Sequence, residues 1–197
     1  MHVSDIARLL NGSSRPLIHV GNGIRHCIPE FLNFVETHGI PFVTARNAND
    51  ICGSDHPFYI GRPGTFAQRG ANFAVQCCDL YIAIGTRLTL TQTGYNSKDY
   101  ARNAQIVQVD IDDAELNKGT LRNPIKIRMD TKEFIDELYQ HTTQLKREWF
   151  EWHKRCHSWK ERYPVVLPEY KEEKGYVNSY WLIDVLSDLA TPEDTII

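Results

Sequence analysis

Turn-forming and charged residues follow four short apolar segments of this sequence. They are Gly21-Asn22-Gly23, Thr44-Ala45-Arg46, Gly85-Thr86-Arg87 and Asp110-Ile111-Asp112. Glycines at such points let backbone N–H groups approach a phosphate, and a carboxylate there can accept hydrogen bonds from ribose hydroxyls. If the four segments are parallel strands, their carboxyl ends meet at one edge of a sheet, where open α/β sheets bind ligands. The pattern therefore predicts a cleft shaped for an adenine nucleotide.

The same residues also have a structural interpretation, and the sequence alone leaves both open. The Gly21 and Gly23 pair lacks the third glycine of the dinucleotide fingerprint, because His26 stands three residues after Gly23. Glycines here could simply permit tight turns between a strand and a helix. Similarly, Asp112 or Asp113 could cap a short helix.

The remaining polar residues form no recognisable catalytic set. Four arginines could pair with a pyrophosphate, although most arginines are simply solvated: Arg25, Arg62, Arg69 and Arg87. His153, Cys156 and His157 lie within one helical turn, but Cys156 belongs to an aromatic stripe, which favours packing over metal ligation. His19 and His26 are interpreted as hydrogen-bonded structural histidines. We expect no catalytic residue and no metal site in this chain.

Composition limits the classes of function. The 197 residues are 42% hydrophobic and 24% charged, which is typical of a soluble globular protein. A net charge of -3 provides no basic surface, so we expect no nucleic-acid partner. No apolar run approaches the roughly 18 residues that span a bilayer, so no membrane partner is expected. The five cysteines include the adjacent Cys77 and Cys78 and form no paired framework, which indicates thiols in a reducing, cytoplasmic setting.

Apolar runs alternate with helical patterns along the first 142 residues. This alternation predicts an α/β fold with a doubly wound, mostly parallel, six-stranded and Rossmann-like sheet. Five of these strands are assigned to residues: 17–20, 41–44, 80–84, 105–109 and 125–129. The expected helices are 5–10, 28–38, 65–77 and one that begins after Asp130 or Thr131. Residues 47–64 are predicted to form a long loop.

The sequence changes character in its last third, where we expect a helical extension. A helix over 144–162 carries an apolar stripe at spacings of three and four, formed by Trp149, Trp152, Cys156, Trp159 and Tyr163. We expect this stripe to pack against the sheet domain or a neighbouring chain. An extended linker is predicted for 164–175 and a helix for 178–189. Residues 194–197 are typical of the opening of a strand, so we expect a fragment of a longer protein.

Six stretches carry a family resemblance through their order and spacing. They are residues 15–25, 39–44, 56–64, 71–74 followed by 78–80, 84–88 and 106–116. Together they resemble the central domain of thiamine-diphosphate-dependent enzymes of the acetolactate synthase group. The resemblance covers this chain from about Ser4 to Leu138.

The resemblance implies a three-domain subunit of a homo-oligomeric transferase or lyase that acts on 2-oxo acids. Residues 1–142 would be its central Rossmann-like domain, 143–176 a helix and linker, and 177–197 the start of the diphosphate-binding domain. The remaining domains of the parent chain would hold thiamine diphosphate and magnesium, so the isolated fragment is expected to be non-catalytic. Two alternatives stay open: a fragment of a decarboxylase of the same family, and an independent adenine-nucleotide-binding domain.

The resemblance also implies a cofactor site. In acetolactate synthases the central domain holds FAD, with its adenosine part in the strand-end cleft. Carried over by motif, the cofactor-binding candidates are Gly21, Asn22, Gly23, Thr44, Gly85, Thr86, Arg87, Asp110 and Asp112.

The chain departs from the family pattern beside this site. After the arginine, FAD-binding members typically have an aromatic residue, two aspartates, Arg-Val-Thr and glycine. Residues 88–94 keep only the final Thr93-Gly94. Because related decarboxylases carry the domain empty or with another adenine nucleotide, FAD, ADP and an empty cleft all remain open.

Overall fold

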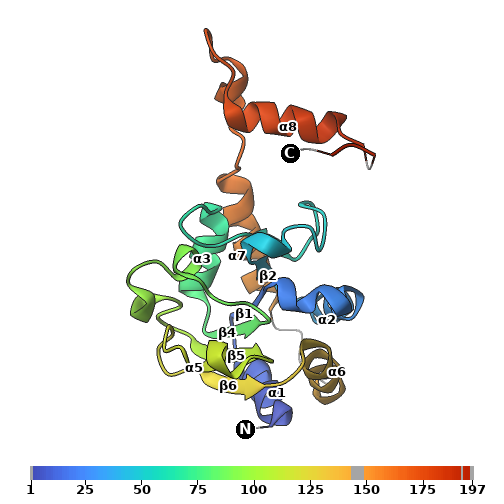
Figure 1. Cartoon of the computed structure of the whole chain (residues 1–197), viewed down its shortest axis with the longest axis vertical. Coiled ribbons are helices and arrows are strands. Elements are labelled where there is room, and N and C mark those ends of the chain that lie inside the picture. Colours follow the sequence, from blue (N-terminus) through green and yellow to red (C-terminus); the bar gives the residue numbers. More distant parts are fainter. Residues whose placement is uncertain (1, 143–148, 192, 196–197) are drawn as a thin grey trace. The chain divides into compact units, whose positions relative to one another are not determined.

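The computed structural model describes residues 2–142, 149–191 and 193–195. The chain divides into two compact units, Met1–Arg162 and Tyr163–Ile197 (Figure 1). Within the described part, none of the helices combines the length and the apolar character that crossing a membrane requires.

The first unit is built on one parallel sheet of six strands in the order β3-β2-β1-β4-β5-β6 (Figure 1). The strands are β1 (Pro16–Val20), β2 (Phe42–Thr44), β3 (Tyr59–Gly61), β4 (Leu80–Ile84), β5 (Gln105–Asp110) and β6 (Ile125–Arg128). The chain runs outward from β1 to β3 and then returns to pair β4 with β1. The strand order therefore reverses between the carboxyl ends of β1 and β4, which is where sheets of this type bind ligands.

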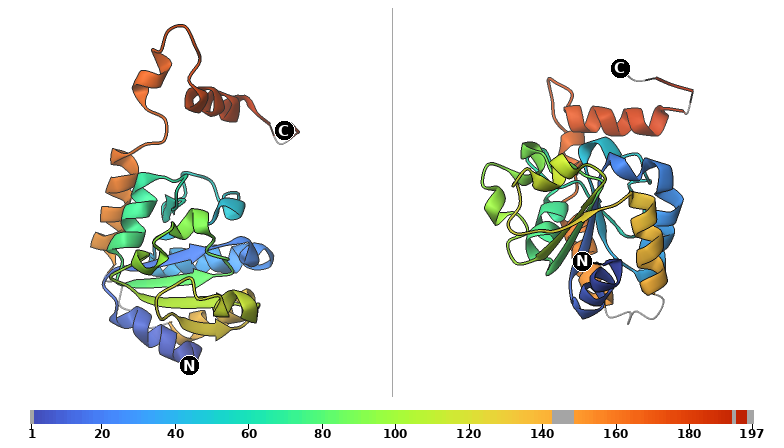
Figure 2. Two further views of the ribbon diagram at one scale, coloured as in Figure 1. Left: turned by 60° about the vertical axis from the view of Figure 1, so that its left-hand side comes forward. Right: turned by 60° about the horizontal axis from the view of Figure 1, so that its bottom comes forward.

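Helices cover both faces of the sheet, which confirms the doubly wound fold (Figure 2). On one face lie α1 (Val3–Gly12), α2 (Ile28–His38) and α6 (Thr131–His141). On the other face lie α3 (Arg69–Cys77) and α7 (Phe150–Arg162). Short elements follow the strands, namely η1 (Asn22–Cys27), η2 (Arg46–Ala48), α4 (Leu90–Thr93), η3 (Ser97–Asp99) and α5 (Asp113–Asn117).

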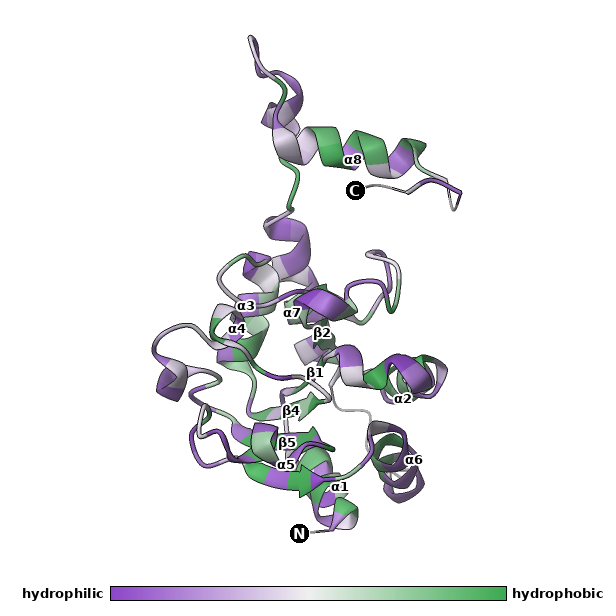
Figure 3. Ribbon diagram, viewed as in Figure 1, coloured by the Kyte–Doolittle hydropathy of each residue, from purple (hydrophilic) through white to green (hydrophobic). Residues whose placement is uncertain are grey.

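Alternate strand residues enter the two cores. Ile18 and Ile82 pack beneath α1, α2 and α6, whereas Leu17 and Tyr81 pack beneath α3 and α7. All four side chains are fully buried. Burial on both faces explains why β4 appears in the sequence as an unbroken apolar run, which has hydrophobic colours in Figure 3.

The apolar stripe of α7 packs against the sheet unit, as predicted. Trp149 is 3% exposed and Trp152 is 4% exposed, and Cys156 is fully buried. The indole N–H of Trp149 donates to the Ser13 carbonyl at 2.9 Å, and that of Trp152 donates to the Pro16 carbonyl at 2.8 Å. These bonds satisfy the polar atoms of both rings as they become buried. The stripe therefore fastens α7 to the start of β1.

One predicted loop contains a strand. Residues 47–64 were expected to be irregular, but Tyr59–Gly61 forms β3 at the edge of the sheet. The strand is only three residues long, and its pairing with β2 shifts register between Phe42 and Val43. So short a segment has no readable periodicity, and the loop prediction was wrong there. β3 forms a strand because it pairs with β2, which the residues of β3 alone do not indicate. By contrast, α2 has the predicted bounds, with Pro29 in its first turn and Gly39 as its left-handed cap.

The second unit contains η4 (Pro168–Lys171) and α8 (Ser179–Leu189). The Asn178 side chain caps α8 by accepting the Tyr180 N–H at 2.9 Å, which confirms the helix predicted for 178–189. The Lys171 ammonium lies 4.2 Å from the ring centre of Trp181. The first residues of the predicted 144–162 helix, and the two isoleucines of the predicted terminal strand, lie outside the described residues. The predicted division of the chain into a domain ending at residue 142, a linker ending at 176 and the start of a further domain remains a prediction.

Candidate functional site

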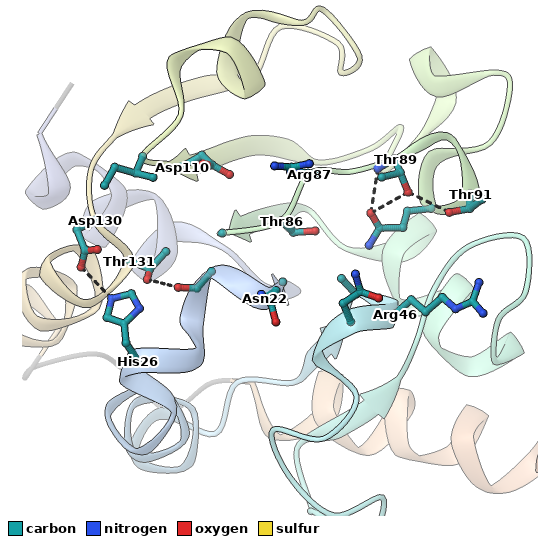
Figure 4. A pocket seen from close by; sticks show the side chains of 17 residues that line it. Asn22, His26, Arg46, Thr86, Arg87, Thr89, Thr91, Asp110, Asp130 and Thr131 are labelled. Carbon is teal, nitrogen blue, oxygen red and sulfur yellow. Dashed lines mark hydrogen bonds and ion pairs between the residues drawn. The ribbon is translucent and has the colours of Figure 1, made fainter. Parts of the chain in front are cut away.

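A cleft of about 560 Å³ lies at the carboxyl edge of the sheet (Figure 4). Its walls come from the turns that follow β1, β2, β4, β5 and β6. Seven of the nine candidates from the sequence line it, namely Gly21, Asn22, Gly23, Gly85, Thr86, Arg87 and Asp110. The volume is within the usual range for small-molecule sites. The four polar turns noted in the sequence therefore converge on one cleft.

The other two candidates do not line the cleft. Thr44 is fully buried, and its hydroxyl contacts the Tyr59 hydroxyl at 3.0 Å and the Asn49 side-chain oxygen at 3.3 Å. Asp112 caps α5 by accepting the Ala114 N–H at 2.8 Å. Each side chain therefore has a structural partner: Thr44 joins β2 to β3, and Asp112 starts a helix.

The glycines at the centre of the cleft are required by backbone packing. The N–H groups of Gly21 and Gly23 donate to the carbonyls of Ile84 and Gly85 at 3.0 Å, and the N–H of Gly85 donates to Val109 at 2.9 Å. A Cβ on Gly23 would lie 2.7 Å from the Gly85 Cα, and Gly85 itself has a φ of +56°. Because these three N–H groups are already used within the sheet, an anion in the cleft must be bound by other groups.

The cleft contains charges of both signs. Asp110 is 9% exposed, and one of its oxygens accepts the Asp112 N–H at 3.0 Å. Asp130 caps α6 by accepting the Lys132 N–H at 2.8 Å, and it also accepts from His26 Nε2 at 3.2 Å. Partial burial opposes ionisation of Asp130, but hydrogen bonds from His26 and the helix backbone leave its pKa below the usual value. Both carboxylates are therefore ordered by the turns that carry them.

Two arginines supply the positive charge. Arg87 follows β4, and its side chain reaches Glu115 at 3.8 Å. Arg46 begins the turn after β2 and lines the cleft, although Thr44 was the candidate predicted from the same triplet. One feature of the sequence could have identified Arg46 as a cleft residue: it is the first charged residue after the strand. Arg25, by contrast, makes a two-pronged contact with Asp50 at 2.7 and 2.9 Å.

Thr86 presents a hydroxyl that none of the described residues pairs. The residue is 2% exposed, and among the described residues its Oγ1 has no hydrogen-bond partner. Leaving a buried hydroxyl unpaired costs about 1–3 kcal/mol. Thr86 lies amid the lining side chains, between the positions of Asn22 and Arg87 in Figure 4. It is therefore a polar group that a bound molecule could satisfy.

A hydrogen-bonded network runs from one wall of the cleft to the buried His19 and Tyr81. Gln92 of α4 lines the cleft, and its side-chain oxygen accepts the Thr89 N–H at 2.9 Å. Its amide nitrogen then faces Nε2 of His19 at 3.3 Å, so His19 accepts there and donates from Nδ1 to the Tyr81 hydroxyl. Burial lowers the pKa of His19 to about 3, so the ring is neutral. His19 is thus the hydrogen-bonded structural histidine that was predicted.

The comparisons with known proteins agree with this architecture. A family model described as "Thiamine pyrophosphate enzyme, central domain" matches residues 3–138. The acetolactate synthase large subunits of Cyanidium caldarium and Porphyra purpurea are both 32% identical, over 84% and 83% of this chain. Acetolactate synthase 1 of Oryza sativa is 30% identical over 97% of the chain. The matched regions are 28–30% of the length of these relatives. With a reversal of strand order beneath a polar cleft and a family match over most of its length, the chain belongs to the thiamine pyrophosphate enzyme central domain family.

Proposed function

We propose that this chain is the central domain of an acetolactate synthase-like, thiamine-diphosphate-dependent enzyme, and that its cleft binds an adenine nucleotide. The observation that supports the nucleotide most directly is the convergence of five strand-end turns on one polar cleft at the switch point of the sheet. The unpaired Thr86 hydroxyl supports it further, because a ligand would satisfy that group.

The charges of the cleft suggest how such a ligand would lie. Asp110 provides a carboxylate for ribose hydroxyls, and the guanidinium groups of Arg46 and Arg87 provide charge-assisted donors for phosphates. Asn22 and Thr86, which lie between these groups in Figure 4, would hydrogen-bond the polar atoms in the middle of the ligand. FAD and ADP share the adenosine diphosphate portion that these residues would hold.

The chemistry of the full-length enzyme is part of the same proposal. Thiamine diphosphate supplies carbanion chemistry on 2-oxo acids when it is bound. We propose that it is held with magnesium by other parts of a longer, cytoplasmic and homo-oligomeric protein, while this domain orders the nucleotide. The residues of this chain would bind and orient, and none of them would carry a proton in the reaction.

Isothermal titration calorimetry of the 197-residue chain with ADP, FAD and NAD tests the nucleotide proposal. We expect ADP or FAD to bind, and Thr86→Val to weaken that binding about 3- to 10-fold, since it removes one hydrogen bond. The same substitution removes an unpaired buried hydroxyl, so the free energy of unfolding should stay constant or rise.

Thr142→Val is the matched control. The Thr142 hydroxyl is buried and donates to the Leu138 carbonyl at 2.7 Å, so its loss should destabilise the fold by about 1 kcal/mol. It does not line the cleft, and nucleotide affinity should not change. If neither ADP nor FAD binds to the unmodified chain, or if both substitutions weaken binding equally, the proposed site is wrong.

A further inference from the structure

A second groove of about 390 Å³ adjoins the cleft. It shares Arg46, Thr91 and Gln92 with the cleft, so the two spaces border the same three side chains. Its remaining walls are Arg62, Pro63 and Phe66 from the loop that follows β3. Figure 4 shows Arg46 extending on the side of Thr91, away from His26 and Asp130.

The groove differs from the cleft in charge. The cleft places Asp110 and Asp130 opposite its arginines, whereas the described residues that line the groove include no carboxylate. Across residues 2–142 and the other described ranges, neither Arg46 nor Arg62 takes part in an ion pair, while Arg87 reaches Glu115. Two guanidinium groups that share a groove without a carboxylate attract an anion, and their planar donors suit phosphate oxygens.

The backbone that carries Arg62 is held in place before any ligand arrives. The Gln68 side chain accepts the Arg62 N–H at 2.7 Å, and the Gln68 N–H donates to the Arg62 carbonyl at 3.0 Å. The Thr65 N–H donates to the Thr91 carbonyl at 2.8 Å, which joins this loop to α4. Because the loop is ordered by its own hydrogen bonds, binding at the groove would require little further ordering of the backbone.

We propose that Arg46 and Arg62 form an anion subsite that takes the terminal phosphates of a nucleotide whose adenosine lies in the cleft. The inference rests on the proposed nucleotide function and adds a preference for longer phosphate chains. Arg46 lines both spaces and would contact the inner phosphates, and Arg62 would contact the outermost one. The ligand class is thus a nucleoside di- or triphosphate, or an ester that extends from one.

Calorimetric titrations with AMP, ADP, ATP and inorganic pyrophosphate test the subsite. In the unmodified chain, affinity should rise from AMP to ADP to ATP. Arg62→Gln should leave AMP affinity within about twofold and lower ATP affinity about tenfold, because one charge-assisted contact is lost. Raising the salt concentration should weaken ATP binding more than AMP binding.

Arg8→Gln is the matched control, because it also removes one positive charge but lies on α1, which lines neither space. It should preserve the ATP preference. If Arg62→Gln retains the full preference for ATP, the subsite is wrong even though the nucleotide cleft stands. If AMP, ADP and ATP all fail to bind, the proposed function fails; pyrophosphate that binds the unmodified chain but not Arg62→Gln would then still support the subsite.

Discussion

His19 should make the stability of the first unit depend on pH between about 3 and 6.5. The ring is fully buried in β1, and burial lowers its pKa from 6.5 to about 3. The unfolded chain therefore binds a proton in this interval that the folded chain does not. The free energy of unfolding rises with pH wherever the unfolded chain binds more protons than the folded chain. The stability that neutral His19 provides is therefore lost as the pH falls below 6.5.

The expected loss is measurable. Each pH unit below the unfolded pKa removes about 1.4 kcal/mol, so moving from pH 7 to pH 5 should remove about 2 kcal/mol through His19 alone. Asp50 contributes little between pH 7 and pH 5. The hydrogen bond from Arg25 lowers the pKa of Asp50 below its usual 3.8, so the stability that this pair provides is lost only as the pH falls below about 3.8.

Urea unfolding followed by tryptophan fluorescence at pH 7 and pH 5 measures the effect. His19→Gln cannot take up the proton, so its free energy of unfolding should fall by about 2 kcal/mol less between the two pH values than that of the unmodified chain. His141→Gln alters an exposed histidine of α6 and should behave as the unmodified chain does. If His19→Gln shows the same loss on acidification as the unmodified chain, the neutral, buried state assigned to His19 is refuted.

Two further pairs of substitutions test the packing on which the site depends. Gly23→Ala places a Cβ 2.7 Å from the Gly85 Cα and should lower the unfolding free energy by about 1–3 kcal/mol. In Gly12→Ala the new Cβ meets no atom within 4 Å other than its neighbours in α1, and the unfolding free energy should change little; thermal melts of both variants measure the difference. Trp152→Ala removes a side chain that is 4% exposed and should lower the free energy of unfolding, measured in urea titrations, by about 3–5 kcal/mol. Phe150 lies on the same helix but is 69% exposed, so Phe150→Ala should lower it by less than about 1 kcal/mol. Equal effects within either pair would contradict the assigned packing.

Several elements could be predicted because their signals are local. The helix α2 has Pro29 in its first turn and Gly39 at its left-handed cap, so both ends are specified by adjacent residues. The apolar run of β4 needs no partner to be recognised. The gathering of strand-end turns at one edge also followed from the sequence, since parallel strands in one sheet direct all their carboxyl ends the same way.

The candidate site was predicted less completely. Thr44 and Arg46 are two residues apart, yet only Arg46 lines the cleft, because the hydroxyl of Thr44 turns to Tyr59 in the edge strand β3. That strand is itself defined by its pairing with β2. A side chain's partner across a sheet depends on register, which the sequence near Thr44 does not specify.

The sequence by itself determined the α/β class, the central strands, the main helices and the family. Only the tertiary structure decided that the glycine N–H groups are used between β1, β4 and β5, and that Arg46 and Arg62 share one groove. Periodicity and caps arise from neighbouring residues, so a sequence displays them directly. Hydrogen bonds such as that from Thr65 to Thr91 join residues far apart along the chain, and these exist only once the strands have paired and the loops are held together.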